Sequence, residues 1–186
     1  MNIIEKAFEK FVELETERFM LREPKEQDSS DVYEIYCDEE AVKYQAIKPA
    51  VNKEQGEQAV AYFVNGFKNK KFIRWSIEDK ENRKVVGLIS LHSFDPINSK
   101  AEIGFMLNRR FWRKGIMNEA AERVIKYAFE EMEIHRIEAI PHPDNIASIN
   151  LSLKLGFKKE GLKHHGAYNR RTEMFEGRVI MGIVNG

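Results

Sequence analysis

The feature that most constrains the fold is a strand-like segment that leads through a short basic loop into an amphipathic helix. Residues 101–107 alternate as a β-strand does, and the loop Phe111-Trp112-Arg113-Lys114-Gly115 follows. Beyond the loop, apolar residues recur at helical spacing over about four turns, at Met117, Ala120, Ala121, Val124, Ile125, Ala128, Phe129 and Met132. The pattern predicts a strand–loop–helix unit.

A loop that contains glycine and opens a helix is a favourable place to hold an anion. The first amides of a helix have no partner within it, and the helix dipole places positive charge at that end. Arg113 and Lys114 add mobile positive charge. The alternative is a plain strand–turn–helix junction, because many such junctions bind nothing. The loop also lacks the Gly-x-x-x-x-Gly-Lys-Ser/Thr pattern of nucleotide hydrolases.

The composition is that of a soluble globular protein and argues against some partners. The 186 residues include 30 basic and 30 acidic side chains, so no overall field points to nucleic acid or a membrane surface. No apolar run approaches the ~20 residues that span a bilayer, and no signal peptide opens the chain. Cys37, the only cysteine, cannot form an internal disulfide, and the five histidines show no zinc-like spacing. We therefore expect a cytoplasmic protein without a metal.

Apolar periodicity and turn residues predict one domain over residues 1–186, with an extra N-terminal helix within residues 1–14. The expected helices are at residues 3–12, 28–37, 52–69, 116–133 and 145–155, and the expected strands at 19–23, 72–78, 85–94, 100–107, 134–140, 157–164 and 175–184. This is an α+β pattern around a mostly antiparallel sheet. Only the strand–helix–strand unit of residues 100–140 needs a parallel pairing, since its connection contains a helix.

The order of these elements, together with five short strings, resembles the GNAT superfamily of acyl-coenzyme-A-dependent N-acetyltransferases. Within it, the strings are similar to the subgroup that includes the bacterial ribosomal-protein N-terminal acetyltransferases. The resemblance runs from about Phe19 to Ile183, and it implies a three-layer α/β/α fold with about seven strands and four to five helices. The strings are Ala101-Glu102-Ile103-Gly104-Phe105, Trp112 to Ala120, Tyr127-Ala128-Phe129, Asn145-Ile146-Ala147-Ser148 and Lys154 to Gly161.

The resemblance implies that acetyl-coenzyme A (acetyl-CoA) is the co-substrate. The family's pyrophosphate motif, Arg/Gln-x-x-Gly-x-Gly/Ala, falls on residues 112–117, with Trp112 and Met117 as departures. A tryptophan first is usual in the subgroup, and Met117 is compatible if its side chain turns into the core. The residues implied to bind the co-substrate are Phe105, Met106, Leu107, Trp112, Arg113, Lys114, Gly115, Ile116, Met117, Asn118 and Asn145.

Acetyl transfer to an amine needs a base with a pKa near neutrality. Glu102 is the candidate, since partial burial beside the thioester would raise its pKa above about 4.3. The alternatives are a solvent-facing Glu102, or one paired with Lys100, and a water relay with no essential base. The subgroup implies Ser148 as the group that meets the leaving thiolate, unless Asn145 and Ser148 only cap a helix. Many family members have a tyrosine where this chain has Ser152.

The acceptor site is expected around Tyr44, Trp75, His92, Tyr168 and Glu176. A carboxylate at Glu176 suits a cationic amine and His92 could shuttle a proton, whereas Arg170 and Arg171 suit an acidic acceptor. The main hypothesis is direct attack by a protein N-terminal amine in a ternary complex. The alternatives are a small amine such as a polyamine, antibiotic or amino acid, and a non-catalytic acyl-coenzyme-A sensor. The assembly stays open between monomer and homodimer.

Overall fold

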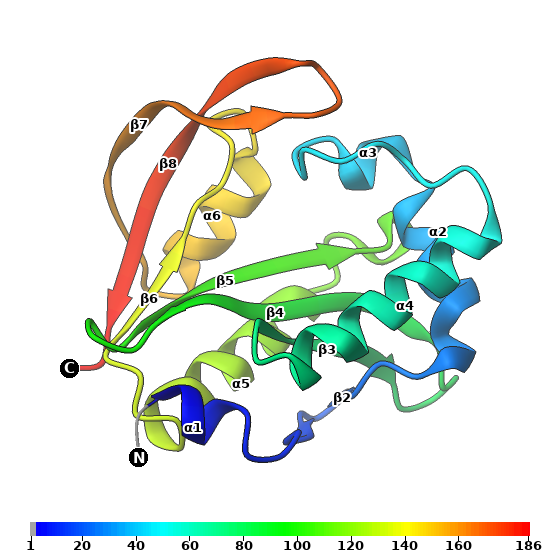
Figure 1. Cartoon of the computed structure of the whole chain (residues 1–186), viewed down its shortest axis with the longest axis horizontal. Coiled ribbons are helices and arrows are strands. Elements are labelled where there is room, and N and C mark those ends of the chain that lie inside the picture. Colours follow the sequence, from blue (N-terminus) through cyan, green and yellow to red (C-terminus); the bar gives the residue numbers. More distant parts are fainter. Residues whose placement is uncertain (1–2) are drawn as a thin grey trace.

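Eight strands form one mixed sheet in the computed structural model, which describes residues 3–186 (Figure 1). Their order is β1-β2-β3-β4-β5-β6-β8-β7, and only the β5–β6 pair is parallel. The strands are β1 (Leu14–Glu15), β2 (Phe19–Arg22), β3 (Phe72–Asp79), β4 (Val85–Asp95), β5 (Lys100–Leu107), β6 (Arg136–Ala139), β7 (Lys158–Asn169) and β8 (Met174–Val184). The predicted α+β class and the parallel pairing are confirmed, with one strand more than expected.

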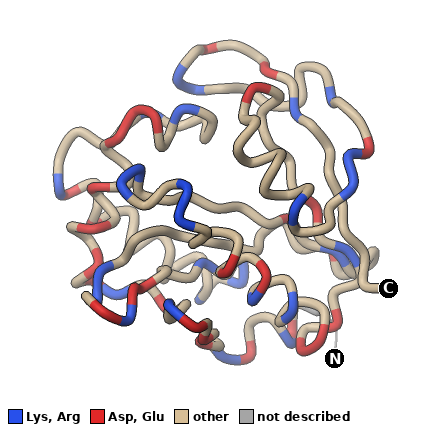
Figure 2. Tube along the Cα trace, turned by 180° about the vertical axis from the view of Figure 1, so that it is seen from behind, with Lys and Arg blue, Asp and Glu red and all other residues tan. Residues whose placement is uncertain are grey.

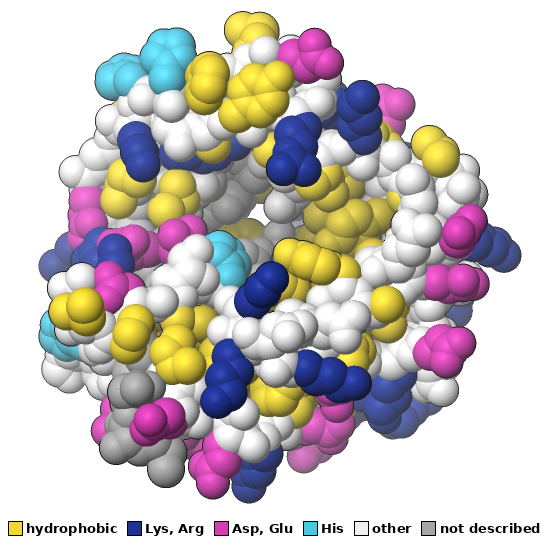
Figure 3. Space-filling model, in the orientation of Figure 1, with side chains coloured by type: hydrophobic (Ala, Val, Ile, Leu, Met, Phe, Trp, Pro, Cys, Tyr) yellow, Lys and Arg dark blue, Asp and Glu magenta, His cyan; other side chains and the backbone are white. Residues whose placement is uncertain are grey.

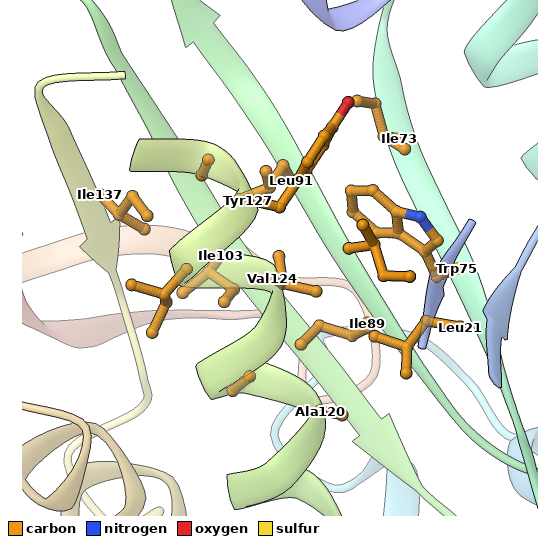
Figure 4. Packing of buried hydrophobic residues seen from close by; sticks show 14 of the residues in the cluster. Leu21, Ile73, Trp75, Ile89, Leu91, Ile103, Ala120, Val124, Tyr127 and Ile137 are labelled. Atoms are coloured by element: carbon orange, nitrogen blue, oxygen red, sulfur yellow. The ribbon is translucent and has the colours of Figure 1, made fainter. Parts of the chain in front are cut away.

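Helices cover both faces of the sheet and give the expected three layers (Figure 1). Helices α2 and α4 pack on one face of the sheet, where Val32 and Phe63 are buried. Helix α5 packs on the other face, where Val124 lies next to Ile89 (Figure 4). The helices are α1 (Ile3–Ala7), α2 (Ser29–Tyr36), α3 (Glu39–Val42), α4 (Lys53–Lys68), α5 (Ile116–Glu130) and α6 (Ile146–Lys154), with short 3-10 turns at Glu26–Asp28 and Arg109–Phe111. The central strands are therefore buried on both faces.

The N-terminal segment is less helical than its apolar spacing predicts. Helix α1 ends at Ala7, and residues 1 and 2 of the expected helix lie outside the described residues. Phe11 packs edge-on against Trp75 with 5.9 Å between ring centroids, and the carbonyl oxygen of Val12 accepts a 2.8 Å hydrogen bond from the Trp75 indole. Phe11 and Val12 thus pack against the core, partly buried, from a segment without regular secondary structure, and the next residues pair as β1.

The connection between α2 and α4, expected to be irregular over residues 38–51, contains the short helix α3. The Asp38 carboxylate accepts hydrogen bonds from the amides of Glu40 and Ala41 at 3.0 and 3.4 Å and caps this helix. The turn that follows brings Gln45 onto β5, where its side-chain amide donates to the Phe105 carbonyl oxygen at 3.3 Å. A capping aspartate was the signal for this helix in the sequence.

Strands β5 and β6 pair over a short distance and then separate. Lys100, Ala101 and Glu102 are opposite Arg136, Ile137 and Glu138, and beyond them β5 continues to its end paired with β4 alone (Figure 1). The rest of β5 therefore presents an open edge toward β6. Buried main-chain groups need partners, so an open edge of this kind is a place for side chains or a ligand to bind.

A buried cluster of charges joins β2 and β3 to the start of α2. The Arg22 guanidinium donates to both carboxylate oxygens of Asp28 at 2.8 Å and to Glu78 at 2.5 Å, and all three residues are at most 3% exposed. Asp28 stands at the N-cap position of α2, but its side chain makes no capping hydrogen bond to that helix. The carboxylate serves the cluster instead, because a buried guanidinium needs a paired charge.

Replacing Arg22 by alanine should therefore lower the free energy of unfolding by about 3–5 kcal/mol, because it leaves the buried Asp28 without a cation and Glu78 with only the exposed Arg83, 2.9 Å away. Lys126→Ala is the matched control: it removes an exposed i,i+4 pair with Glu130, 3.9 Å apart, and should cost at most about 1 kcal/mol. Urea denaturation of the two variants measures the difference. Equal losses would show that burial does not set the strength of the Arg22 cluster.

Candidate active site

A cavity of about 740 Å³ opens along the free edge of β5. Its walls are the rest of β5, the loop before α5, the segment from β6 into α6, and residues 40–45 that follow the start of α3. Figure 3 shows the hollow at the centre of this face of the molecule, with hydrophobic side chains along part of its wall. The split between β5 and β6 thus leads into this cavity.

The basic loop supplies one end of the cavity, as the sequence predicts. Gly115 caps α5 in the left-handed conformation at φ 74°, and Arg113 is also left-handed at φ 62°. The amides that open α5 face the cavity with no partner inside the helix, which is the arrangement that holds an anion. Met117 is only 7% exposed. Its side chain packs into the core, so the departure from a small residue leaves the loop open.

The open edge of β5 carries the next expected set, Phe105, Met106 and Leu107, and all three line the cavity. Two of their carbonyl oxygens already accept hydrogen bonds from side chains. Gln45 donates to that of Phe105 at 3.3 Å, and the Trp112 indole donates to that of Leu107 at 2.9 Å. Trp112 thus has a structural role at the motif's first position, and Gln45 is a cavity residue that sequence reasoning missed.

Asn145 and Ser148 form the helix cap that the sequence left open as an alternative. The Asn145 side-chain oxygen accepts a 3.1 Å hydrogen bond from the Ser148 amide at the start of α6. Both residues also line the cavity, so the cap presents the Ser148 hydroxyl and the Asn145 amide group there. Ser152 is 1% exposed and lies outside the cavity, so its hydroxyl does not reach the cavity from the position where many family members have tyrosine.

Glu102 and His92 lie side by side at the other end of β5. They are directly opposite each other on neighbouring strands, and Glu102 Oε2 is 4.0 Å from His92 Nδ1. Burial raises the pKa of Glu102 above its usual range. Burial, helped by the positive charge of Arg74, lowers the pKa of His92 to about 4. The same removal from water therefore favours a more basic carboxylate and a neutral imidazole at neutral pH.

The cavity also separates charges along its length, although Figure 2 shows both signs interspersed over the whole trace. Glu102 lies five residues before Leu107, so the two ends of this edge are about 17 Å apart. Lining residues with positive charge include Arg113 and Lys114 on the loop, while Glu40, Glu102 and Asp144 carry negative charge. Because the overall charge of the protein is zero, charged ligands are selected by the residues that line the cavity.

A stacked aromatic pair forms part of the cavity wall. Tyr44, expected at the acceptor site, stacks on His142 with 5.3 Å between ring centroids and 23° between planes. Both residues line the cavity, together with the acidic side chains of Glu40 and Asp144. Sequence reasoning missed His142, Glu40 and Asp144, because none belongs to a motif and only the fold brings their segments together.

Three residues expected at the acceptor site lie outside the cavity. Trp75 is fully buried on the α5 face, edge-on to Tyr127 with 6.2 Å between ring centroids, so its predicted contact with the acceptor is wrong (Figure 4). The reason is register, since Trp75 points to the face opposite His92. Tyr168 is half exposed on the β7–β8 hairpin, and Glu176 lies behind the wall, 3.6 Å from His142 Nε2.

Comparisons with known proteins agree on the family. The chain matches the model of the acetyltransferase (GNAT) domain over residues 18–158. It is 32% identical over 159 residues to the uncharacterized N-acetyltransferase YoaA of Bacillus subtilis (strain 168), covering 86% of this chain and 90% of that protein. A shorter match, 31% over 78 residues, is to the ribosomal-protein-serine acetyltransferase of Escherichia coli (strain K12), covering 42% of this chain and 44% of that protein.

A comparison with solved structures shows the same fold in a known acetyltransferase. The crystal structure of a GNAT-family acetyltransferase from Bacillus anthracis superimposes with a TM-score of 0.82 at 24% identity, covering 93% of this chain and 98% of that one. The chain therefore belongs to the GNAT family of acetyltransferases. It is an N-acetyltransferase, with acetyl-CoA as co-substrate. Among the described residues, no helix is long and apolar enough to cross a membrane, and no group of His, Cys, Asp or Glu is arranged to hold a metal.

Arg113 and Lys114 should strengthen binding of coenzyme A through its phosphates. The double variant Arg113→Ala/Lys114→Ala should weaken the affinity about tenfold, since charge-assisted contacts are lost, and should reduce the dependence of affinity on salt. Lys126→Ala, on the exposed side of α5, also removes a positive charge and is the control for net charge. Calorimetric titration with coenzyme A at two salt concentrations measures both effects. An unchanged affinity would place the phosphates elsewhere.

Proposed function

We propose that this protein transfers the acetyl group of acetyl-CoA to a primary amine, with the N-terminal amine of a protein as acceptor. The observation that carries the proposal is the polarised cavity along the free edge of β5, with helix amides and cations at one end and a half-buried carboxylate at the other. The phosphates fit the loop before α5, and the pantetheine arm would follow β5. The acidic residues suit a cationic amine.

The reaction is a direct attack in a ternary complex. The amine nitrogen bonds to the thioester carbon, the carbon–sulfur bond breaks, and coenzyme A leaves as the thiolate. The nitrogen gives up its proton to Glu102, whose raised pKa makes it a better base than an exposed carboxylate. The Ser148 hydroxyl on the cavity wall would donate a hydrogen bond to the thiolate. A main-chain amide of β5 would stabilise the oxyanion.

Support for a protein acceptor comes from the similarity to the ribosomal-protein-serine acetyltransferase over part of the chain. One observation favours a small amine as a second candidate. The stack of Tyr44 on His142 forms a compact aromatic wall beside Glu40 and Asp144. Aromatic faces and carboxylates together bind small organic cations well.

A panel of acceptors separates the two candidates. With acetyl-CoA present, peptides with a free N-terminus should give a kcat/KM at least about tenfold above that of polyamines, aminoglycosides or free amino acids, since a peptide also contacts residues beyond the cavity. Release of the coenzyme A thiol is the measurement, and N-terminally blocked peptides are the control. Faster turnover of a small amine would replace the protein acceptor by the second candidate. Tight binding of acetyl-CoA without turnover would indicate a sensor.

Glu102→Gln tests the base. The variant should lower kcat by about 10²–10⁴-fold, the range of a general base. In the wild type, activity should fall as pH drops through the raised pKa of Glu102, because the protonated carboxyl group cannot accept the amine proton. The variant should lose this acid limb. Glu138→Gln, opposite Glu102 on β6, is the control: it should keep the acid limb but move it to lower pH, because the charge of Glu138 raises the pKa of Glu102. An unchanged profile in Glu102→Gln would point to a water relay.

A further inference from the structure

Glu176 lies behind the aromatic wall of the cavity and is not one of the residues that line it. It is on β8, and its side chain is 17% exposed. Its Oε2 lies 3.6 Å from Nε2 of His142, which does line the cavity. In place of an acceptor, the carboxylate therefore meets a residue of the wall.

Both carboxylate oxygens of Glu176 are already engaged by protein donors. Oε1 accepts hydrogen bonds from the Asn169 side-chain amide at 2.7 Å and from the Thr172 hydroxyl at 3.1 Å. Oε2 accepts one from the Arg178 guanidinium at 3.4 Å. Burial by itself would raise the pKa of Glu176, but the hydrogen bonds from Asn169 and Thr172 hold it below its usual value. The carboxylate is thus ionised and fixed, which suits a supporting group and not a base.

The turn between β7 and β8 keeps Glu176 in place. Asn169, which donates to the carboxylate, is 2% exposed, and its side-chain oxygen accepts hydrogen bonds from two amides of the turn at 2.8 and 3.4 Å. Arg171 of the same turn donates to the Glu39 carbonyl oxygen at 3.5 Å, so the hairpin lies beside α3 (Figure 1). The hairpin therefore contacts both segments that form the aromatic wall.

The hydrogen bonds of His142 fix where its ring proton lies. Nδ1 accepts a 3.1 Å hydrogen bond from the Asp144 main-chain amide, so that nitrogen must carry a lone pair. A neutral imidazole with a bare Nδ1 has its proton on Nε2, on the side of Glu176. The 3.6 Å separation is longer than a hydrogen bond, and the attraction between this N–H and the carboxylate is electrostatic.

With both nitrogens facing protein groups, His142 offers the cavity a flat ring and not an acid or a base. Tyr44 stacks on that ring with 5.3 Å between centroids and 23° between planes. Tyr44 comes from the turn after α3, and His142 from the segment between β6 and α6, so the stack joins two walls of the cavity. The orientation of the stack depends on what holds the imidazole from behind.

We propose that Glu176 is a positioning residue, which holds the His142 ring so that the Tyr44–His142 stack forms the surface on which the acceptor amine is placed. This proposal rests on the acetyl transfer proposed above and deepens it. The carboxylate touches neither the acceptor nor acetyl-CoA. His142 and Tyr44 determine specificity, because the acceptor lies against their rings, and such a surface suits a compact organic cation.

Glu176→Gln tests this role. The variant keeps the size of the side chain, but the His142 N–H loses its negatively charged partner. The KM for a peptide with a free N-terminus should rise about tenfold, the low end of the loss when a carboxylate that orients a metal-binding histidine is removed. The KM for acetyl-CoA, kcat and the acid limb should not change, since Glu102 still takes the proton. A fall in kcat of about 10²–10⁴-fold with an unchanged acceptor KM would make Glu176 a general base and overturn the proposal.

Glu173→Gln is the matched control. Glu173 is exposed in the turn of the same hairpin and lies outside the cavity. The variant removes the same negative charge from the hairpin and should leave the acceptor KM at its wild-type value. An equal rise in both variants would show that the charge of the hairpin acts at long range, without His142.

His142→Phe removes the link between Glu176 and the wall. Phenylalanine keeps a flat ring that can stack on Tyr44, but it has no N–H to meet the carboxylate. In this background Glu176→Gln should cause no further rise in the acceptor KM, because the two changes remove one and the same interaction. A full tenfold rise there would overturn the proposal.

Spectra of the His142 ring separate failure of this proposal from failure of the proposed function, because they need no acceptor. Nitrogen-15 spectra of the wild type should show a bare Nδ1 and a protonated Nε2, and a protonated Nδ1 would overturn the proposal. The ring current of Tyr44 should shift the His142 ring protons, less in Glu176→Gln than in Glu173→Gln. Equal shifts would show that Glu176 does not hold the ring. If no amine is acetylated, the proposed function fails, and the spectra still decide what Glu176 does.

Discussion

The separation of β5 from β6 is the constraint on which the rest of this structure depends. The two strands share only the pairs that involve Lys100, Ala101 and Glu102. Past that point one edge of a central strand is free, although the sheet is covered on both faces. A free edge inside a protein must find partners, and side chains of Gln45 and Trp112 already occupy two of its carbonyl oxygens. A co-substrate with amides along its arm suits what remains.

The loop before α5 is held in place by the rest of the fold. Arg18, just before β2, pairs with Glu119 at 2.7 Å and donates to the Lys114 carbonyl oxygen at 3.2 Å. Ile116 is buried as well, so the first turn of α5 is anchored from the core side while its amides face the cavity. An anion site made of main-chain amides works only when the backbone is already in position, because ordering it during binding would weaken the affinity.

Burial has opposite consequences for the two titratable groups at the far end of the cavity. It makes the Glu102 carboxylate more basic and keeps the His92 imidazole neutral, because each group avoids its charged form away from water. When the environment shifts the pKa values of two neighbouring groups in opposite directions, the two groups can take different roles in proton transfer.

The sequence by itself determined the strand–loop–helix unit, the parallel pairing, and the placing of Glu102, Asn145, Ser148 and the loop residues, because these follow from local periodicity and short motifs. Tertiary structure decided the rest. Trp75 entered the core because strand register put it on the α5 face, and Phe11 packs against that core, partly buried, from a segment that is not helical. Gln45 and His142 reached the cavity through a capped turn and a stacked aromatic pair. Such contacts join distant segments, so no local pattern records them.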